Sequence, residues 1–333
     1  MTETLLRLEG LRTAFRTPRG LLQAVDGVDV RVEAGETVAI VGESGSGKSV
    51  TALSVLRLFA AADGARLEGA IHWRGRDGAT VDLLRLDERG IRAIRGRDIA
   101  VIFQDPGASL NPVFTVGEQI REALRRHRTG EDATRVAAEL LDDVGIADPR
   151  ARLRAYPHQL SGGMRQRVMI AIALACAPRL LIADEPTTAL DVTIQAQILR
   201  LLAELKSKHA MALLFITHDL ALVGEIADRV VVMYAGQVVE TGATHDVLHA
   251  PRHPYTRALL DCRPQRRYRD DDEDERVLMP IPGAPPRPFE RPAGCRFAPR
   301  CALAEDACRA GPIALEAVGD DRTSRCRRWR DAT

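Results

Sequence analysis

The sequence predicts an α/β fold in which helices cover a mainly parallel β-sheet. Short apolar runs that end at polar residues have the length and composition of buried strands, and they are Thr37–Val41, Ile99–Phe103, Leu180–Asp184 and Ala212–Thr217. Helix-period stretches lie between these runs, and the clearest begins after Asp191, a residue suited to an N-cap. Strands that alternate with helices in this way favour a parallel sheet with helices on its faces.

A smaller, antiparallel sheet is predicted beside the parallel one. Val230–Met233 and Gln237–Thr241 flank the dipeptide Ala235-Gly236, an arrangement typical of a β-hairpin. Near the N-terminus, Leu5–Leu11 and Ala24–Val32 alternate between apolar and polar residues, as exposed strands do. The antiparallel side sheet accounts for both patterns.

Changes in composition predict two further parts. Between Asp105 and His158 the strand patterns give way to polar helical stretches, which indicates an inserted helical subdomain. Residues 280–292 hold six prolines, which is typical of an extended linker. The sequence therefore divides into a core of residues 1–104 and 165–245, a helical subdomain of residues 105–164 and a C-terminal extension of residues 246–333.

Composition limits the choice of partners. The 333 residues include 47 Lys and Arg against 46 Asp and Glu, so the net charge of +1 provides no general attraction for nucleic acid or anionic lipid. The N-terminal residues lack the pattern of an export signal, and the most apolar run, Val168–Ala177, is too short to cross a bilayer. We therefore expect a cytoplasmic protein that reaches a membrane only through partner proteins.

One segment matches the phosphate-binding loop pattern G-x-x-x-x-G-K-[ST], the Walker A motif, in full. It follows the predicted strand Thr37–Val41 and precedes a helical stretch, as the motif requires, and a chance glycine-rich turn is the alternative. Its backbone N–H groups can face phosphate oxygens, Lys48 can reach the outer phosphates and Ser49 can bind Mg²⁺. The loop residues expected to bind ATP are Gly42, Ser44, Gly45, Gly47, Lys48 and Ser49.

Two carboxylates follow a buried strand. Asp184 and Glu185 lie at the C-terminal end of Leu180–Asp184, the edge at which ligands bind in open α/β sheets. We expect Asp184 to bind Mg²⁺ and Glu185 to polarise the attacking water as a catalytic base. An Asp-Glu pair after a strand is often only a helix N-cap. Together with the phosphate loop, however, the pair predicts a P-loop NTPase core.

A third motif indicates which kind of NTPase this is. Leu160–Arg167 opens a predicted helix and resembles the signature sequence of ABC ATPases, with Met in place of the usual Gln. A helix N-terminus formed by Ser161, Gly162 and Gly163 can bind a γ-phosphate, and a plain Ser-capped helix is the alternative. The resemblance covers residues 5–248 and implies that two such subunits enclose two nucleotides.

Four more positions resemble functional residues of ABC ATPases. Gln104 follows the strand Ile99–Phe103 and resembles the Q-loop glutamine, which senses Mg²⁺. Ala189–Asp191 resembles the D-loop, and His218 resembles the switch histidine that contacts the γ-phosphate. Phe15 lies where the family stacks an aromatic ring on adenine, although an ordinary edge-strand aromatic is the alternative. The resemblance therefore implies catalytic roles for Lys48, Gln104, Glu185 and His218.

Several segments resemble the ATP-binding subunits of oligopeptide and dipeptide importers, namely Gln104–Pro112, Leu160–Arg167, His253–Thr256 and the cysteine-rich tail. This resemblance implies an ATPase that couples ATP binding and hydrolysis to uptake of di- and oligopeptides across the cytoplasmic membrane. The implied partners are a second ATPase subunit in a heterodimer, two integral membrane permease subunits and a periplasmic or extracellular solute-binding protein. The implied location is the cytoplasmic face of the cell membrane.

The cargo and the class of protein leave alternatives open. Similar subunits serve importers of nickel and of glutathione, and an ATPase subunit does not touch its cargo. A soluble ABC ATPase would use the same motifs, but such proteins usually carry two ATPase cassettes or a coiled-coil insert. The cysteine-rich tail also leaves a redox-sensing regulator as an alternative.

Cysteines cluster near the C-terminus. Four of the six, Cys295, Cys301, Cys308 and Cys326, lie in the last part of the chain. Four thiolates can bind either Zn²⁺ or a [4Fe–4S] cluster, and spacing alone does not decide between them. The tight pairs usual in zinc sites are absent, and the importer resemblance implies the iron–sulfur cluster. Zn²⁺, and free or disulfide-bonded thiols, remain the alternatives.

Overall fold

The computed structural model describes residues 3–127, 132–188, 190–262 and 280–332. The chain forms two compact units. The first contains Met1–Arg7, Arg31–Thr37 and Ile71–Thr217, and the second contains Leu8–Val30, Val38–Ala70 and His218–Thr333.

Three parallel strands form the core of the first unit. They are β6 (Ile99–Ile102), β7 (Leu180–Asp184) and β8 (Ala212–Thr217). β7 lies between the other two, with Leu180 opposite Ile99 on one side and Ala212 on the other. β6 is one residue shorter than the sequence predicts, because Phe103 leaves the sheet and 41% of it is exposed.

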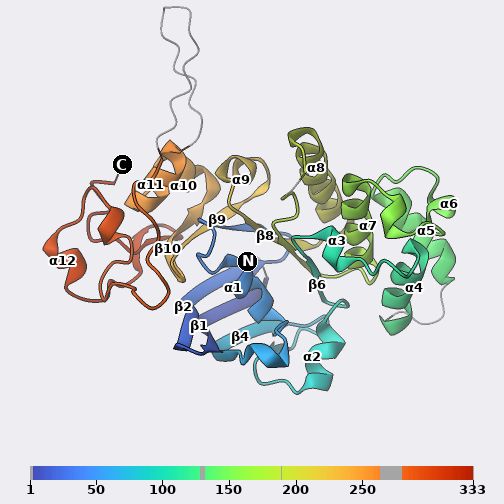
Figure 1. Ribbon diagram of the computed structural model, residues 1–333, viewed down its shortest axis with the longest axis horizontal. Coiled ribbons are helices and arrows are strands. Elements are labelled where there is room, and N and C mark those ends of the chain that lie inside the picture. The colour runs from blue at the N-terminus through green and yellow to red at the C-terminus, as the bar shows by residue number, and fades with distance from the viewer. Residues whose placement is uncertain (1–2, 128–131, 189, 263–279, 333) are drawn as a thin grey trace, which may run out of the picture. The chain divides into compact units, whose positions relative to one another are not determined.

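Helices make up most of the rest of the first unit (Figure 1). α4, α5 and α7 pack against one another, and α3 packs on α7. The buried side of α5 carries Val136, Ala137, Leu140 and Leu141, in which each residue has a buried neighbour three or four positions away, as in an amphipathic helix. The helices are α2 (Glu88–Ile94), α3 (Pro106–Ser109), α4 (Val116–His127), α5 (Ala133–Asp143), α6 (Pro149–Arg152), η2 (Pro157–Gln159), α7 (Gly162–Leu174) and α8 (Val192–His209).

The second unit combines parallel and antiparallel strands. β3 (Thr37–Val41) pairs in parallel with β9 (Arg229–Tyr234), which forms a hairpin with β10 (Gln237–Ala243). β12 (Arg322–Ser324) then pairs antiparallel with β10, and β11 (Glu316–Gly319) with β12. The helices are α1 (Lys48–Val55), η1 (Ala61–Asp63), α9 (Leu220–Ile226), α10 (Thr244–His249), α11 (Pro254–Asp261), η3 (Ala298–Arg300) and α12 (Asp306–Arg309).

A side sheet has the order β2-β1-β4-β5, from β1 (Thr4–Thr17), β2 (Gly20–Glu33), β4 (Arg66–Arg74) and β5 (Thr80–Asp82). Three of its four strands, β1, β2 and β4, supply residues to both units, and β5 belongs to the first unit. β4 and β5 are antiparallel. The predicted fold class, an α/β core with an antiparallel side sheet, a helical insert and a C-terminal extension, is confirmed. The prediction that the hairpin of β9 and β10 belongs to the side sheet is wrong, because β9 pairs in parallel with β3.

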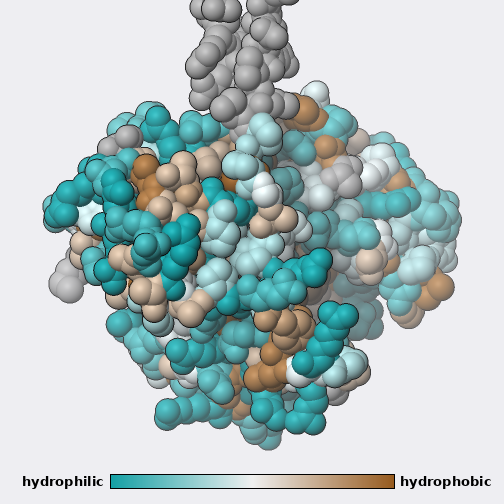
Figure 2. Space-filling view, turned by 60° about the vertical axis from the view of Figure 1, so that its left-hand side comes forward, coloured by the Kyte–Doolittle hydropathy of each residue, from teal (hydrophilic) through white to brown (hydrophobic). Residues whose placement is uncertain are grey.

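The surface is mainly polar on the face shown in Figure 2, where apolar residues form small separate groups. Among the described residues, no helix has both the length and the apolar character needed to span a bilayer.

Candidate nucleotide-binding site

The phosphate loop connects β3 to α1 in the second unit. β3 is buried along its whole length, and the loop then leaves the sheet at Gly42. At Gly42 φ is 150°, and an added Cβ would lie 2.1 Å from the carbonyl oxygen of Met233, so only glycine fits. Gly47, with φ of 101°, ends the loop as the N-cap of α1. The loop therefore leads directly into the N-terminus of α1, and a helix N-terminus favours the binding of anions.

The side chain of Lys48 is buried and hydrogen-bonded within the loop. Only 4% of the residue is exposed, and its Nζ donates hydrogen bonds to the carbonyl oxygens of Gly42 at 2.7 Å and Glu43 at 3.1 Å. The lysine thereby closes the loop on itself. Ser44 and Gly45 are exposed at its tip, and Ser49 lies in the first turn of α1. A buried cation in a glycine-rich turn suits a phosphate ligand.

The carboxyl ends of β6 and β7 bring two predicted residues together in the first unit. Gln104 Nε2 donates a hydrogen bond to Glu185 Oε2 at 3.1 Å. Thr188 Oγ1 donates to the same oxygen at 3.0 Å, a contact that the motifs do not predict. Glu185 has a φ of 46°, which is unusual for a residue other than glycine, and its N–H donates to Ile216 of β8 at 2.9 Å. The glutamate is therefore fixed at both backbone and side chain.

Asp184 directly precedes Glu185. It is the last residue of β7 and is 6% exposed. The carboxylate of Asp184 and the amide oxygen of Gln104 in the first unit, and the hydroxyl of Ser49 in the second, are oxygen ligands of the kind that Mg²⁺ prefers. Each of these residue types therefore suits a role as a Mg²⁺ ligand.

The signature segment begins α7. Ser161 is its N-cap, and Ser161 Oγ accepts a hydrogen bond from Met164 N at 3.3 Å. Ser161 and Gly162 are exposed, whereas a Cβ on Gly163 would lie 3.2 Å from Ile194 of α8. The glycines thus keep the helix tip uncovered and allow α8 to approach.

The remaining predicted residues occupy three different places. Asp191 is the N-cap of α8 and accepts from Ile194 N at 3.0 Å, as predicted, while Ala189 lies outside the described residues. His218 is exposed directly after β8. Phe15 is half-buried in β1, and its ring packs edge-on against Phe59 at 5.3 Å between centroids.

The four tail cysteines line one cavity in the second unit, together with His253 and Phe297. Burial raises the pKa of the Cys295, Cys301 and Cys326 thiols, and negative charge on the neighbouring cysteines raises it further. For Cys326 the pKa reaches about 12. Four thiols are the donor set of zinc and iron–sulfur sites. Within the described ranges, however, no three His, Cys, Asp or Glu side chains form a group that could hold a metal ion.

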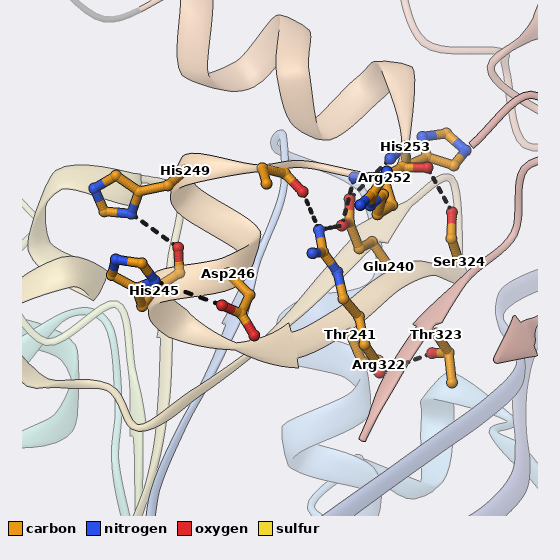
Figure 3. A network of polar contacts seen from close by, with 11 residues as sticks. Glu240, Thr241, His245, Asp246, His249, Arg252, His253, Arg322, Thr323 and Ser324 are labelled. Atoms are coloured by element: carbon orange, nitrogen blue, oxygen red, sulfur yellow. Dashed lines mark hydrogen bonds and ion pairs between the residues drawn. The ribbon is translucent and has the colours of Figure 1, made fainter. Parts of the chain in front are cut away.

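A buried ion pair joins the extension to β10 (Figure 3). Arg322 Nη2 lies 2.8 Å from Glu240 Oε1, and the Glu240 side chain has no exposed surface. Glu240 also accepts the backbone N–H groups of Arg252 at 2.7 Å and His253 at 3.0 Å. Arg322 in turn donates to the carbonyl oxygen of Ala250. The network fixes the chain that leads from β10 to α11.

Comparison with known proteins agrees with these features. The family model described as ABC transporter matches residues 25–188, and the model described as oligopeptide/dipeptide transporter, C-terminal region, matches residues 239–308. A putative peptide import ATP-binding protein of Brucella abortus is 54% identical, covering 99% of this chain and 98% of that protein. The dipeptide transport ATP-binding protein DppD of Escherichia coli is 51% identical, covering 97% of this chain and 96% of that protein.

Solved structures resemble the chain in the same way. A dimeric post-hydrolysis state of the ATP-binding cassette MJ0796 with ADP and phosphate is 26% identical, with a TM-score of 0.63 over 72% of this chain and 99% of that one. The transporter component cbiO1 of Clostridium perfringens is 27% identical, with a TM-score of 0.61 over 74% of this chain and 90% of that one. The chain therefore belongs to the ATP-hydrolysing subunits of ABC transporters, within the family of peptide and dipeptide import ATP-binding proteins.

Proposed function

We propose that this subunit powers the import of di- and oligopeptides. The observation that carries this proposal is the similarity, over nearly the whole length, to proteins named for peptide and dipeptide import. The match of residues 239–308 to the C-terminal region of oligopeptide transporters supports the same cargo class. Nickel and glutathione remain the alternatives.

We assign the chemistry to the predicted residues. The loop residues Gly42, Ser44, Gly45, Gly47, Lys48 and Ser49 bind the phosphates, Phe15 the adenine, and Ser49, Gln104 and Asp184 hold Mg²⁺. Mg²⁺, when bound, neutralises charge on the β- and γ-phosphates. Glu185 accepts a proton from the attacking water, and His218 contacts the γ-phosphate. Residues Ser161, Gly162, Gly163 and Asp191 act on the nucleotide of a partner subunit. The division into core, helical subdomain and extension is part of the same proposal.

The polar contacts of Glu185 support its assignment as the base. Gln104 and Thr188 both donate to Oε2, at 3.1 and 3.0 Å, so the carboxylate is oriented before nucleotide binds. The Glu185→Gln variant removes the base and keeps the size of the side chain. We expect ATPase turnover of the assembled transporter to fall by about 10² or more. Turnover near that of the wild type would contradict the assignment.

Exposed apolar side chains support docking to permease subunits. Around Gln104, Phe103 is 41% exposed, Val113 71% and Phe114 46%. Contiguous apolar patches on a surface mark interaction sites. We propose that they meet two integral membrane subunits at the cytoplasmic face of the membrane. A second ATPase subunit completes a heterodimer, and a solute-binding protein delivers the cargo.

We also propose that the four tail cysteines hold a [4Fe–4S] cluster, with Zn²⁺ as the alternative. What supports this is that all four thiols line one cavity, although they would have to move closer together to bind a metal. Metal analysis and the visible absorption spectrum of anaerobically purified protein distinguish the two.

The cargo is tested by a different experiment. Uptake by the reconstituted transporter should be compared for dipeptide, nickel and glutathione.

A further inference from the structure

The extension reaches the phosphate loop at Glu43, the second residue of that loop. Arg300 binds the Glu43 carboxylate with both arms of its guanidinium, Nη1 to Oε2 at 2.7 Å and Nη2 to Oε1 at 3.0 Å. Only 5% of the Arg300 side chain and 27% of the Glu43 side chain are exposed. A bidentate ion pair that is mostly buried is stronger and more directional than an ion pair on the surface.

The backbone of Glu43 is held as well. Its N–H donates to the hydroxyl of Tyr255 at 2.8 Å, while its carbonyl oxygen accepts from Lys48 Nζ at 3.1 Å. Tyr255 is fully buried at the start of α11. Both the peptide group and the side chain of Glu43 are thus fixed, and two of the three partners come from residues beyond β10.

Aromatic packing fixes these partners in turn. The ring of Tyr255 lies 4.5 Å from that of Tyr234 and 5.3 Å from that of Phe297, between centroids. The Arg300 guanidinium lies 5.8 Å from the Tyr234 ring and donates to its hydroxyl at 3.2 Å. Rings packed in this way limit side-chain motion. We call Glu43, Tyr255 and Arg300 the Glu43 brace.

Charge gives the Glu43 brace a role beyond packing. An unpaired carboxylate in a loop that binds a triphosphate would repel the ligand, and the repulsion would be only partly screened near a protein surface. Arg300 neutralises that carboxylate through the ion pair. The loop therefore tolerates an acidic residue because the extension supplies a cation.

We propose that Tyr255 and Arg300 are positioning residues for ATP binding, which couple the cysteine-bearing extension to the phosphate loop through Glu43. The proposal rests on the proposed binding of ATP at Gly42–Ser49. Arg300 directly precedes Cys301, which lines the cysteine cavity. The His253–Thr256 segment, which the ATPase motifs leave without a role, gains one through Tyr255.

The test is a titration of the full-length chain with a fluorescent N-methylanthraniloyl ATP in the presence of Mg²⁺. The Arg300→Ala variant should bind the probe about tenfold more weakly, since it loses a charge-assisted pair. The Tyr255→Phe variant, which keeps the ring, should bind several-fold more weakly. Adding Glu43→Gln to Arg300→Ala should restore part of the affinity, and raising the salt concentration should reduce the defect of Arg300→Ala. A purely structural role predicts neither effect.

Arg309→Ala is the matched control, because Arg309 is also next to a cysteine of the cavity, Cys308, but its ion pair, at 3.6 Å, is with the exposed Asp306. It should bind the probe like the wild type.

If Arg300→Ala does not fold, the Arg300→Lys variant serves in its place. It keeps the positive charge but loses the bidentate guanidinium, so its affinity for the probe should be intermediate. Wild-type affinity in Tyr255→Phe and in Arg300→Ala or Arg300→Lys would overturn the proposal. Failure of the wild type to bind the probe, or equal binding by Lys48→Ala, would instead overturn the proposed function.

Discussion

The phosphate loop and the cysteine cavity are two candidate ligand sites within one unit, and they are built differently. The loop takes its groups from the consecutive residues 42–49, and Lys48 closes it through carbonyl oxygens only six and five positions away. The cavity takes its thiols from residues spread over 295–326, in a part of the chain with few regular elements (Figure 1). The loop is shaped mainly by its own backbone, whereas the cavity depends on contacts that hold the extension in place.

The largest effect is expected where the extension joins β10. The Glu240→Ala variant leaves the Arg322 guanidinium buried without its carboxylate, and removes the acceptor of two backbone N–H groups. Breaking a buried ion pair by removing one partner costs about 3–5 kcal/mol. We expect the free energy of unfolding, measured with urea, to fall by this amount. The cysteines should also become more reactive toward a thiol reagent.

Glu305→Ala is the control for this prediction. Glu305 belongs to the same extension and lies 3.7 Å from Arg328, but 44% of its side chain is exposed. Its removal should cost less than about 1 kcal/mol, as for exposed pairs. Equal losses in the two variants would show that the extension does not depend on the buried pair.

A smaller effect, confined to the nucleotide site, is expected at the loop. The Lys48→Ala variant removes the cation and the two hydrogen bonds that close the loop. We expect ATP turnover to fall by about 10²–10³, or roughly 3–4 kcal/mol of transition-state stabilisation. Thiol reactivity should stay that of the wild type. If Lys48→Ala exposed the cysteines as Glu240→Ala does, the contrast between the two sites would be wrong.

The same contrast explains what the sequence could predict. The loop, the strand that precedes it and the N-cap at Asp191 depend on neighbours along the chain, so their patterns predict them. The nearness of Gln104 and Glu185 follows from a local pattern, because each residue lies directly after a predicted strand and the two strands are parallel neighbours. The Glu43–Arg300 pair joins residues 257 positions apart, and no local pattern marks Arg300 among the many arginines. Such a contact is fixed by tertiary packing alone.

The smallest effect is expected at the strand pairing beside the buried ion pair. Thr241 of β10 and Thr323 of β12 lie opposite each other, with their hydroxyl oxygens 2.7 Å apart (Figure 3). The Thr323→Val variant keeps the shape and β-propensity of the side chain but leaves the Thr241 hydroxyl without this partner. A single neutral hydrogen bond is worth about 0.5–1.5 kcal/mol, so urea unfolding should show a loss in that range.

The double variant Thr241→Val/Thr323→Val makes this prediction sharper. Replacing both hydroxyls by methyl groups leaves no unpaired polar atom, so its stability should return toward that of the wild type. This result would assign the attachment of the extension mainly to Glu240 and Arg322, because the strand pairing tolerates the loss of its side-chain bond. A double variant as unstable as Glu240→Ala would instead place the attachment in the pairing of β10 with β12.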